Sequence, residues 1–170
     1  MIAPAELRGR SRRELAALMT SGRSFEPDAV AGWIYRGISL GLPRLIERLT
    51  WVKFAKVFER DRSGVRGWNM RIEQDALDRP WRPRLRRGAP ITFGHFEVTS
   101  SGGDVMLDYR GERGPIRTLR DPIVALDDRA DVLFGRSLIA IGSRTFATPS
   151  YFVLERDRPL RSPGTSPALV

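Results

Sequence analysis

Lys56 is the residue of this chain whose type and surroundings most readily suggest chemistry. It lies two residues after Phe54 and two before Phe58, so a strand through this segment would place it on an apolar face. A lysine on such a face must reach water, find a carboxylate or lose its proton, because desolvation lowers its pKa. An amine of lowered pKa can act as a base or as a Schiff-base nucleophile. A salt bridge at the rim of the fold, with Asp108 or Asp121 as the partner by residue type, is the alternative interpretation.

Asp108 and Tyr109 complete the set of candidate catalytic residues with Lys56. Asp108 lies between Leu107 and Tyr109, so in a strand its side chain faces away from both. A carboxylate there could serve as a general base or accept a hydrogen bond from a ligand. Pairing of Asp108 with an arginine such as Arg36 is the competing structural interpretation.

His95 is the only histidine, and it lies in the apolar segment 93–97. A single histidine can be an axial ligand of haem, but without a second ligand pattern it is more simply a strand residue. A zinc site needs several ligands, and the chain contains no cysteine. The glycines at 102–103 and 111–114 lack the strand–glycine–helix order of nucleotide-binding motifs. The sequence therefore predicts no bound metal or cofactor.

The segment 79–88 is the clearest surface feature. It combines one tryptophan, Trp81, with five arginines: Arg79, Arg82, Arg84, Arg86 and Arg87. This composition suits contacts with phosphates and stacking on a base or a lipid headgroup. We therefore expect that it can contact an anionic surface, although no named nucleic-acid motif accompanies it.

Length and charge limit the function classes. A chain of 170 residues fits one domain, since single cores usually contain about 100–200 residues. The net charge of +9 and the pI of about 11.1 favour anionic partners, although a solvated basic surface explains them as well. The charged N-terminus does not resemble a signal peptide, and no apolar run approaches the roughly 18 residues of a membrane span. The sequence predicts a soluble, cytoplasmic protein.

The apolar pattern changes from helical to alternating along the chain. Residues 4–20 predict a helix that ends at Ser21-Gly22, and Pro43 begins a short helix over 42–50. Residues 51–60 alternate and predict a strand, while one helix over 43–59 is the alternative. The predicted strands are 31–37, 51–60, 65–74, 91–99, 105–109, 122–126, 132–141 and 146–155.

Short turns join most of these strands, and this favours antiparallel neighbours. About eight strands close a barrel just wide enough for side chains or one small ligand. We therefore predict a mostly β protein, a small antiparallel up-and-down barrel with an N-terminal helix and a short helix after the first strand. A two-sheet sandwich is the alternative. The expected organisation is a helix and linker over 1–24, a barrel domain over 25–156 and a disordered tail over 157–170.

Several short motifs occur in the order found in one protein family. They are Gly32-Trp33-Ile34-Tyr35-Arg36-Gly37, Trp51 to Phe58, Met106 to Tyr109, Asp121-Pro122-Ile123 and Tyr151 to Arg156. Together they resemble the bacterial GXWXG-type proteins of unknown function over about residues 28–156, although Gly32 and Trp33 are adjacent where the motif has a residue between them. The resemblance implies a calycin-like (lipocalin-like) barrel. It implies no established activity, and fold alone does not fix function.

The aromatic residues on the predicted strands suggest an apolar interior. The candidate ligand-binding residues are Trp33, Tyr35, Phe54, Trp68, His95, Phe96 and Phe134. The first hypothesis is a barrel that binds a small hydrophobic molecule. The second is a cyclase- or isomerase-type enzyme that uses acid–base groups inside the same barrel. The third is a basic adaptor that binds nucleic acid or an anionic membrane through the segment 79–88.

Overall fold

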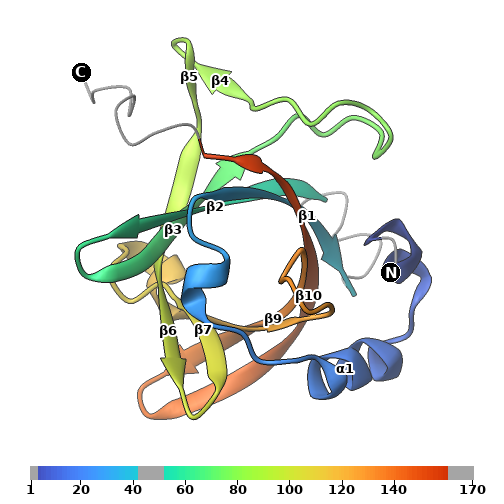
Figure 1. Cartoon of the computed structure of the whole chain (residues 1–170), viewed down its shortest axis with the longest axis vertical. Coiled ribbons are helices and arrows are strands. Elements are labelled where there is room, and N and C mark those ends of the chain that lie inside the picture. The colour runs from blue at the N-terminus through green and yellow to red at the C-terminus, as the bar shows by residue number, and fades with distance from the viewer. Residues whose placement is uncertain (1–3, 42–51, 161–170) are drawn as a thin grey trace.

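The chain folds into a closed barrel of eight antiparallel strands in the order β1-β10-β9-β8-β7-β6-β3-β2 (Figure 1). The computed structural model describes residues 4–41 and 52–160. The barrel strands are β1 (Trp33–Leu40), β2 (Lys53–Asp61), β3 (Gly64–Arg71), β6 (Thr92–Ser101), β7 (Asp104–Asp108), β8 (Leu119–Ala125), β9 (Val132–Ile141) and β10 (Arg144–Pro159). Consecutive barrel strands are neighbours, and β10 pairs with β1 to close the ring. The predicted up-and-down barrel is confirmed.

The segment around Lys56 is a strand, and this decides between the two interpretations of residues 51–60. β2 pairs with β1 on one side and with β3 on the other. In this register Lys56 lies between Tyr35 of β1 and Asn69 of β3. The helix predicted over 42–50 falls outside the described residues.

The N-terminal helix is divided into two pieces. A 3-10 helix, η1 (Pro4–Gly9), precedes the α-helix α1 (Arg12–Ser21), in place of one predicted helix over 4–20. The Ser11 side chain accepts a hydrogen bond from the Glu14 amide, and the Glu14 carboxylate accepts one from the Ser11 amide. This reciprocal cap starts a new helix at Ser11. The Ser-x-x-Glu spacing was readable in the sequence.

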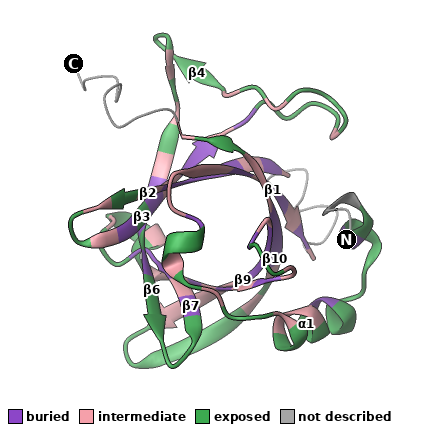
Figure 2. Ribbon diagram, in the orientation of Figure 1, coloured by how far each residue is buried: buried purple, intermediate pink, exposed green. Residues whose placement is uncertain are grey.

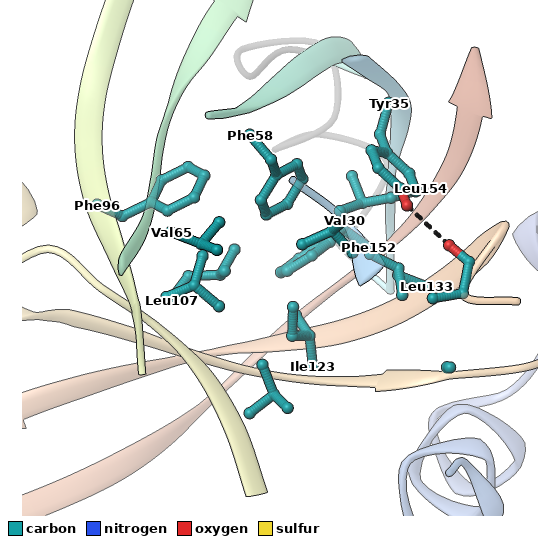
Figure 3. Close-up of a cluster of buried hydrophobic side chains, with 14 of the residues drawn as sticks. Val30, Tyr35, Phe58, Val65, Phe96, Leu107, Ile123, Leu133, Phe152 and Leu154 are labelled. Atoms are coloured by element: carbon teal, nitrogen blue, oxygen red, sulfur yellow. Dashed lines mark hydrogen bonds between the residues drawn. The ribbon is translucent and has the colours of Figure 1, made fainter. Parts of the chain in front are cut away.

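Apolar side chains pack both inside the barrel and against part of its outer surface. The buried residues lie mainly on the barrel strands (Figure 2). The inner cluster includes Tyr35, Phe58, Val65, Phe96, Leu107, Ile123, Phe152 and Leu154 (Figure 3). A second buried cluster, on the alternate residues of β1, β9 and β10, packs with the N-terminal helices and contains Leu7, Leu15, Ile38, Leu40, Val132, Phe134, Tyr151 and Val153. The N-terminal segment thus covers part of the outer barrel surface.

The two ends of the barrel differ. A short 3-10 helix, η2 (Pro27–Ala29), lies across one opening in the view of Figure 1, and Val30 after it is fully buried in the inner cluster. At the other end, Phe54 and Leu119 are partly buried together with Ile116 of the 3-10 helix η3 (Gly114–Thr118). The polar residues considered below lie toward this second end.

The remaining parts of the chain add one projection and one extended strand to the barrel. A two-stranded hairpin of β4 (Leu85–Arg86) and β5 (Ala89–Pro90) projects from the barrel within the predicted loop 78–90 (Figure 1). β10 continues to Pro159, three residues past the predicted end of the barrel domain. Among the described residues, no helix is long and apolar enough to cross a bilayer. The cytoplasmic location stays a prediction.

Candidate functional site

Lys56 lies inside the barrel, where its amine is held by side chains from neighbouring strands. It is 3% exposed. Its Nζ donates to Asn69 Oδ1 at 2.8 Å and to the Tyr109 hydroxyl at 2.6 Å. The Tyr109 hydroxyl in turn donates to Asp121 Oδ2 at 3.1 Å, and this oxygen lies 3.9 Å from Lys56 Nζ. We call these four residues, Lys56, Asn69, Tyr109 and Asp121, the inner polar cluster.

Aromatic rings surround the Lys56 amine. Its Nζ lies 5.0 to 5.6 Å from the ring centroids of Phe54, Phe96, Tyr109 and Phe152. An ammonium within about 6 Å of a ring face is attracted by the ring quadrupole. The rings also exclude water, so they make each hydrogen bond of the cluster electrostatically stronger.

Burial changes the protonation of all three titratable groups in the cluster. Desolvation lowers the pKa of Lys56 to about 8, although the nearby Asp121 carboxylate opposes this change. Burial raises the pKa of Asp121, and the Lys56 charge partly counteracts it. Burial and the Asp121 charge together raise the pKa of Tyr109 well above its usual value. Near neutral pH, Lys56 is therefore mostly a cation, and Tyr109 retains its proton.

The polar cluster is incompletely satisfied by the protein. An ammonium has three donors, and the hydrogen bonds to Asn69 and Tyr109 use two of them. Asp121 Oδ1 is buried and has no hydrogen-bond partner among the described residues. The Ser137 hydroxyl is near enough to lower the pKa of this carboxyl, but it is not in hydrogen-bonding geometry with Oδ1. A buried acceptor without a donor is costly, so this arrangement requires an explanation.

Asn69 was missed as a site residue because the two faces of β3 are the reverse of the expected ones. The sequence places Trp68, Met70 and Ile72 on one face of this strand and Asn69 on the other. Asn69 points inward and donates from Nδ2 to the Gly94 carbonyl at 2.9 Å, which turns its Oδ1 toward Lys56. Met70 and Ile72 form an outer cluster with Trp81. The alternation was therefore correct, but it could not tell which face is inside.

Apolar side chains, several of them aromatic, occupy the rest of the barrel interior. A Cβ atom at Gly135 would lie 2.2 Å from the Phe152 ring, and one at Gly67 would lie 2.6 Å from the Phe96 ring. At Gly37 the distance to the Phe54 ring would be 2.4 Å. Glycines on neighbouring strands thus make room for inward-facing rings. Two surface hollows, one beside Arg71 and Arg84 and one around Asp108 and Arg120, are not lined by the inner polar cluster.

The predicted ligand-binding residues are distributed over different parts of the fold. Tyr35, Phe54 and Phe96 face the interior. Trp33 lies near the η2 end, with the Arg156 guanidinium 4.8 Å from its ring centroid. Phe134 stacks on Tyr151 in the outer cluster under α1.

Trp68 and His95 lie together on the outside of the barrel. Their ring centroids are 6.3 Å apart. The His95 ring nitrogen Nδ1 lies 2.7 Å from Glu112, and this imidazole is largely exposed. No group of three or more metal-ligating side chains occurs within residues 4–41 and 52–160.

Asp108 is directed to the outer side of the barrel wall, where it is only 7% exposed, and does not belong to the inner polar cluster. Its carboxylate accepts a hydrogen bond from Arg110 Nε at 2.7 Å, and Arg120 lies 3.4 Å away. Burial acts to raise the pKa of Asp108, but the hydrogen bonds from Arg110 outweigh it, and the pKa is lowered. Asp121, the other acid named as a partner for Lys56, takes the inner position.

The comparisons with known proteins show no family. No family model matches the chain, and no curated protein matches it. Among solved structures, an odorant-binding protein described as "Odorant Binding Protein OBP1" has a TM-score of 0.40 and 12% identity, covering 83% of this chain and 79% of that one. So low a likeness carries no functional argument, and the fold assignment rests on the strand topology. Membership of the GXWXG-type family stays a prediction.

Proposed function

We propose that this protein binds a small, mainly apolar molecule that carries one hydroxyl or similar polar group, with the inner polar cluster as its anchor. The observation that supports this most is the pair of unmatched polar atoms inside the barrel. Lys56 has a donor to spare, and Asp121 Oδ1 has no donor partner. A ligand group that both accepts and donates a hydrogen bond would satisfy the two together.

The surroundings of the cluster suit an apolar ligand body. Phe54, Phe96 and Phe152 offer ring faces near the amine. Ligand sites of this kind are mostly apolar and contain a few polar groups that fix orientation. Phe54 is partly buried and its ring lies 5.6 Å from Lys56 Nζ, so the end of the barrel at which Phe54 lies is the proposed entrance.

Binding requires that side chains yield space, because rings fill the interior. Phe54 is the best candidate to move, since it is the half-buried member of the ring set around Lys56. Its ring lies over Gly37, which has no side chain to hold it in place. We therefore propose that the ligand displaces Phe54 toward the entrance. This predicts selectivity for small rings rather than long chains.

A second candidate function is acid–base catalysis of the isomerase or cyclase type. The hydrogen-bonded path from Lys56 through Tyr109 to Asp121 favours it. An amine whose pKa is about 8 can exchange a proton near neutral pH. In this function Lys56 and Tyr109 are the proposed catalytic residues, and Asp121 takes the role expected of Asp108.

The binding proposal is tested with three aromatic probes of similar size: benzyl alcohol, acetophenone and toluene. Benzyl alcohol both donates and accepts, acetophenone only accepts, and toluene does neither. We expect benzyl alcohol to raise the melting temperature most and to shift the NMR signals of Lys56, Asn69 and Tyr109. Lys56→Met is expected to abolish the preference for benzyl alcohol over acetophenone and toluene. Lys53→Met is the matched control, because Lys53 lies on the same strand, is 1% exposed and bonds to Asp75 and the Ala76 carbonyl instead of the inner polar cluster.

The same titration distinguishes the proposal from a purely structural cluster. No change in melting temperature or NMR signals with any probe would overturn binding at this site. Equal responses to benzyl alcohol and toluene would show that the polar cluster does not anchor the ligand.

A further inference from the structure

The β4–β5 hairpin and the segment before it form an exposed cationic surface. It comprises Arg79, Arg82, Arg84, Arg86 and Arg87, which we call the hairpin arginines. All five are exposed. Within the part of the chain that the structure describes, no ion pair of these side chains with a carboxylate is found. The nearby Asp75 is already paired with Lys53.

The hairpin is held in a defined position on the barrel. The Arg84 amide donates to the Arg71 carbonyl at 2.8 Å, and the Ile91 amide donates to the Arg84 carbonyl at 3.0 Å. At the tip, Arg87 and Gly88 both have positive φ, of 52° and 79°, as a tight two-residue turn requires. The arginines are thus presented on an anchored hairpin that projects from the barrel (Figure 1).

Leu85 adds an apolar group to this charged surface. It is 56% exposed, one of three large apolar side chains classed as exposed within residues 4–41 and 52–160, and it pairs with Pro90, which is also exposed. An apolar side chain beside several cations suits the boundary between lipid headgroups and acyl chains. The hydrated phosphate backbone of a nucleic acid offers no comparable apolar contact for Leu85.

Trp81 distinguishes a membrane from a nucleic acid as the partner. Binding of a single strand relies on exposed aromatic rings on which bases stack. The Trp81 ring instead lies 5.1 Å from Lys53 Nζ and packs against Met70 and Ile72. It anchors the segment and is not free to stack on a base.

We propose that the hairpin arginines and Leu85 form a docking surface for a membrane that contains anionic phospholipid. The arginines bind the lipid phosphates, and Leu85 enters the headgroup boundary. The net charge of +9 attracts the protein to such a surface over a longer range. This surface lies outside the inner polar cluster, so the proposal stands or falls independently of small-molecule binding.

The test is sedimentation with two kinds of vesicle, phosphatidylcholine alone and phosphatidylcholine with about a third phosphatidylserine. We expect binding only to the second kind, with affinity falling steeply as salt rises. A variant with Arg82, Arg84, Arg86 and Arg87 replaced by serine should lose about fivefold for each charge, or several hundredfold in all.

A matched control removes the same charge elsewhere. Replacing the exposed Arg62, Arg113, Arg129 and Arg144 by serine should cost less than about tenfold, because these residues are scattered over the surface. Leu85→Ser should weaken vesicle binding severalfold and leave its salt dependence unchanged. All these side chains are exposed, so the variants should fold, and their melting temperatures check this.

Three results would overturn the proposal. Equal losses in the hairpin variant and in the control would show that net charge alone is responsible. Wild-type binding to a single-stranded oligonucleotide but not to anionic vesicles would identify a nucleic acid as the partner. No effect of Leu85→Ser would remove the apolar contact that distinguishes a membrane from any other polyanion.

Discussion

Lys56 and Asp121 lie 3.9 Å apart inside the barrel, and the Tyr109 hydroxyl connects them by accepting from the amine and donating to the carboxylate. The two charged groups therefore interact mainly through a third residue. Removal of one member of this bridge leaves the other buried polar groups without hydrogen-bond partners, and this should lower the free energy of unfolding. The first two predictions concern this bridge.

Removal of the bridging hydroxyl should destabilise the fold. Tyr109→Phe leaves Lys56 and Asp121 each with one hydrogen bond fewer, and we expect a loss of about 1–3 kcal/mol in the free energy of unfolding. Urea titration measures it. Tyr151→Phe is the control, because Tyr151 is equally buried but stacks on Phe134 in the outer cluster, and it should cost about 1 kcal/mol or less. Equal losses in the two variants would argue against a special role of Tyr109.

The pH dependence of stability should report on Lys56. Its pKa of about 8 in the folded state lies below the ordinary value of 10.5, so the folded protein releases this proton first as the pH rises. Between about pH 8 and 10.5 the unfolded state binds more protons, and stability must rise with pH. We expect wild type to gain about 2–3 kcal/mol across this window relative to Lys56→Met.

Urea titrations at several pH values measure this difference. Lys53→Met serves as the comparison, since it removes the other lysine of β2 but leaves the inner polar cluster intact. A constant difference between wild type and Lys56→Met from pH 8 to 10.5 would show that the Lys56 amine does not titrate in this range.

The filled interior leads to a steric prediction. In Gly135→Ala the new methyl group meets the Phe152 ring, and Ile123 also lies within 2.9 Å of it, so the core must shift. We expect a loss of about 1–3 kcal/mol, partly recovered when Phe152→Leu is added. Gly111→Ala, where nothing lies within 4 Å of the added atom, is the control. Thermal unfolding of wild type, the two single variants and the double variant measures these changes in stability. A Gly135→Ala variant as stable as wild type would contradict a filled barrel.

Phe54 should control entry to the barrel. Phe54→Ala removes the ring that we expect the ligand to displace, so benzyl alcohol should associate severalfold faster, while the protein loses about 1–3 kcal/mol of stability. Stopped-flow mixing and urea titration measure the two effects. Phe146→Ala is the control, because that ring is 50% exposed on the β9–β10 hairpin. Unchanged association in Phe54→Ala would place the entrance elsewhere.

Much of the fold could be predicted because each element has a local signal. The alternation of Val52, Phe54 and Phe58 with Lys53, Ala55 and Glu59 favoured a strand over the competing helix at β2. Short turns rich in glycine and aspartate marked the hairpins of the later strands. The position of Lys56 on an apolar face followed from the same alternation, whereas alternation put Asp108 and Tyr109 on opposite faces without showing which one faces the interior. Alternation can be read from the sequence because successive side chains of a strand always point to opposite faces, whatever the strand packs against.

The remaining features depend on contacts that are distant in sequence. Phe134 alternates like an inner residue, but α1 covers the outer surface at that point and buries it there. Trp81 likewise covers Met70 and Ile72 on the outer face of β3 and buries them there, and Asn69 faces the interior. Alternation assigns two faces to a strand, but tertiary packing decides which face meets the barrel interior when other elements can cover the opposite face.

The central claim, that the inner polar cluster anchors a small molecule, is tested most directly by native mass spectrometry of the protein isolated from its own cells. Wild type and Lys53→Met should carry the same bound mass, released on denaturation, and Lys56→Met and Asp121→Asn should lack it. NMR spectra of the variants establish that they are folded. If wild type carries no additional mass and binds none of the aromatic probes, or if Lys56→Met retains the same bound mass, the account is contradicted.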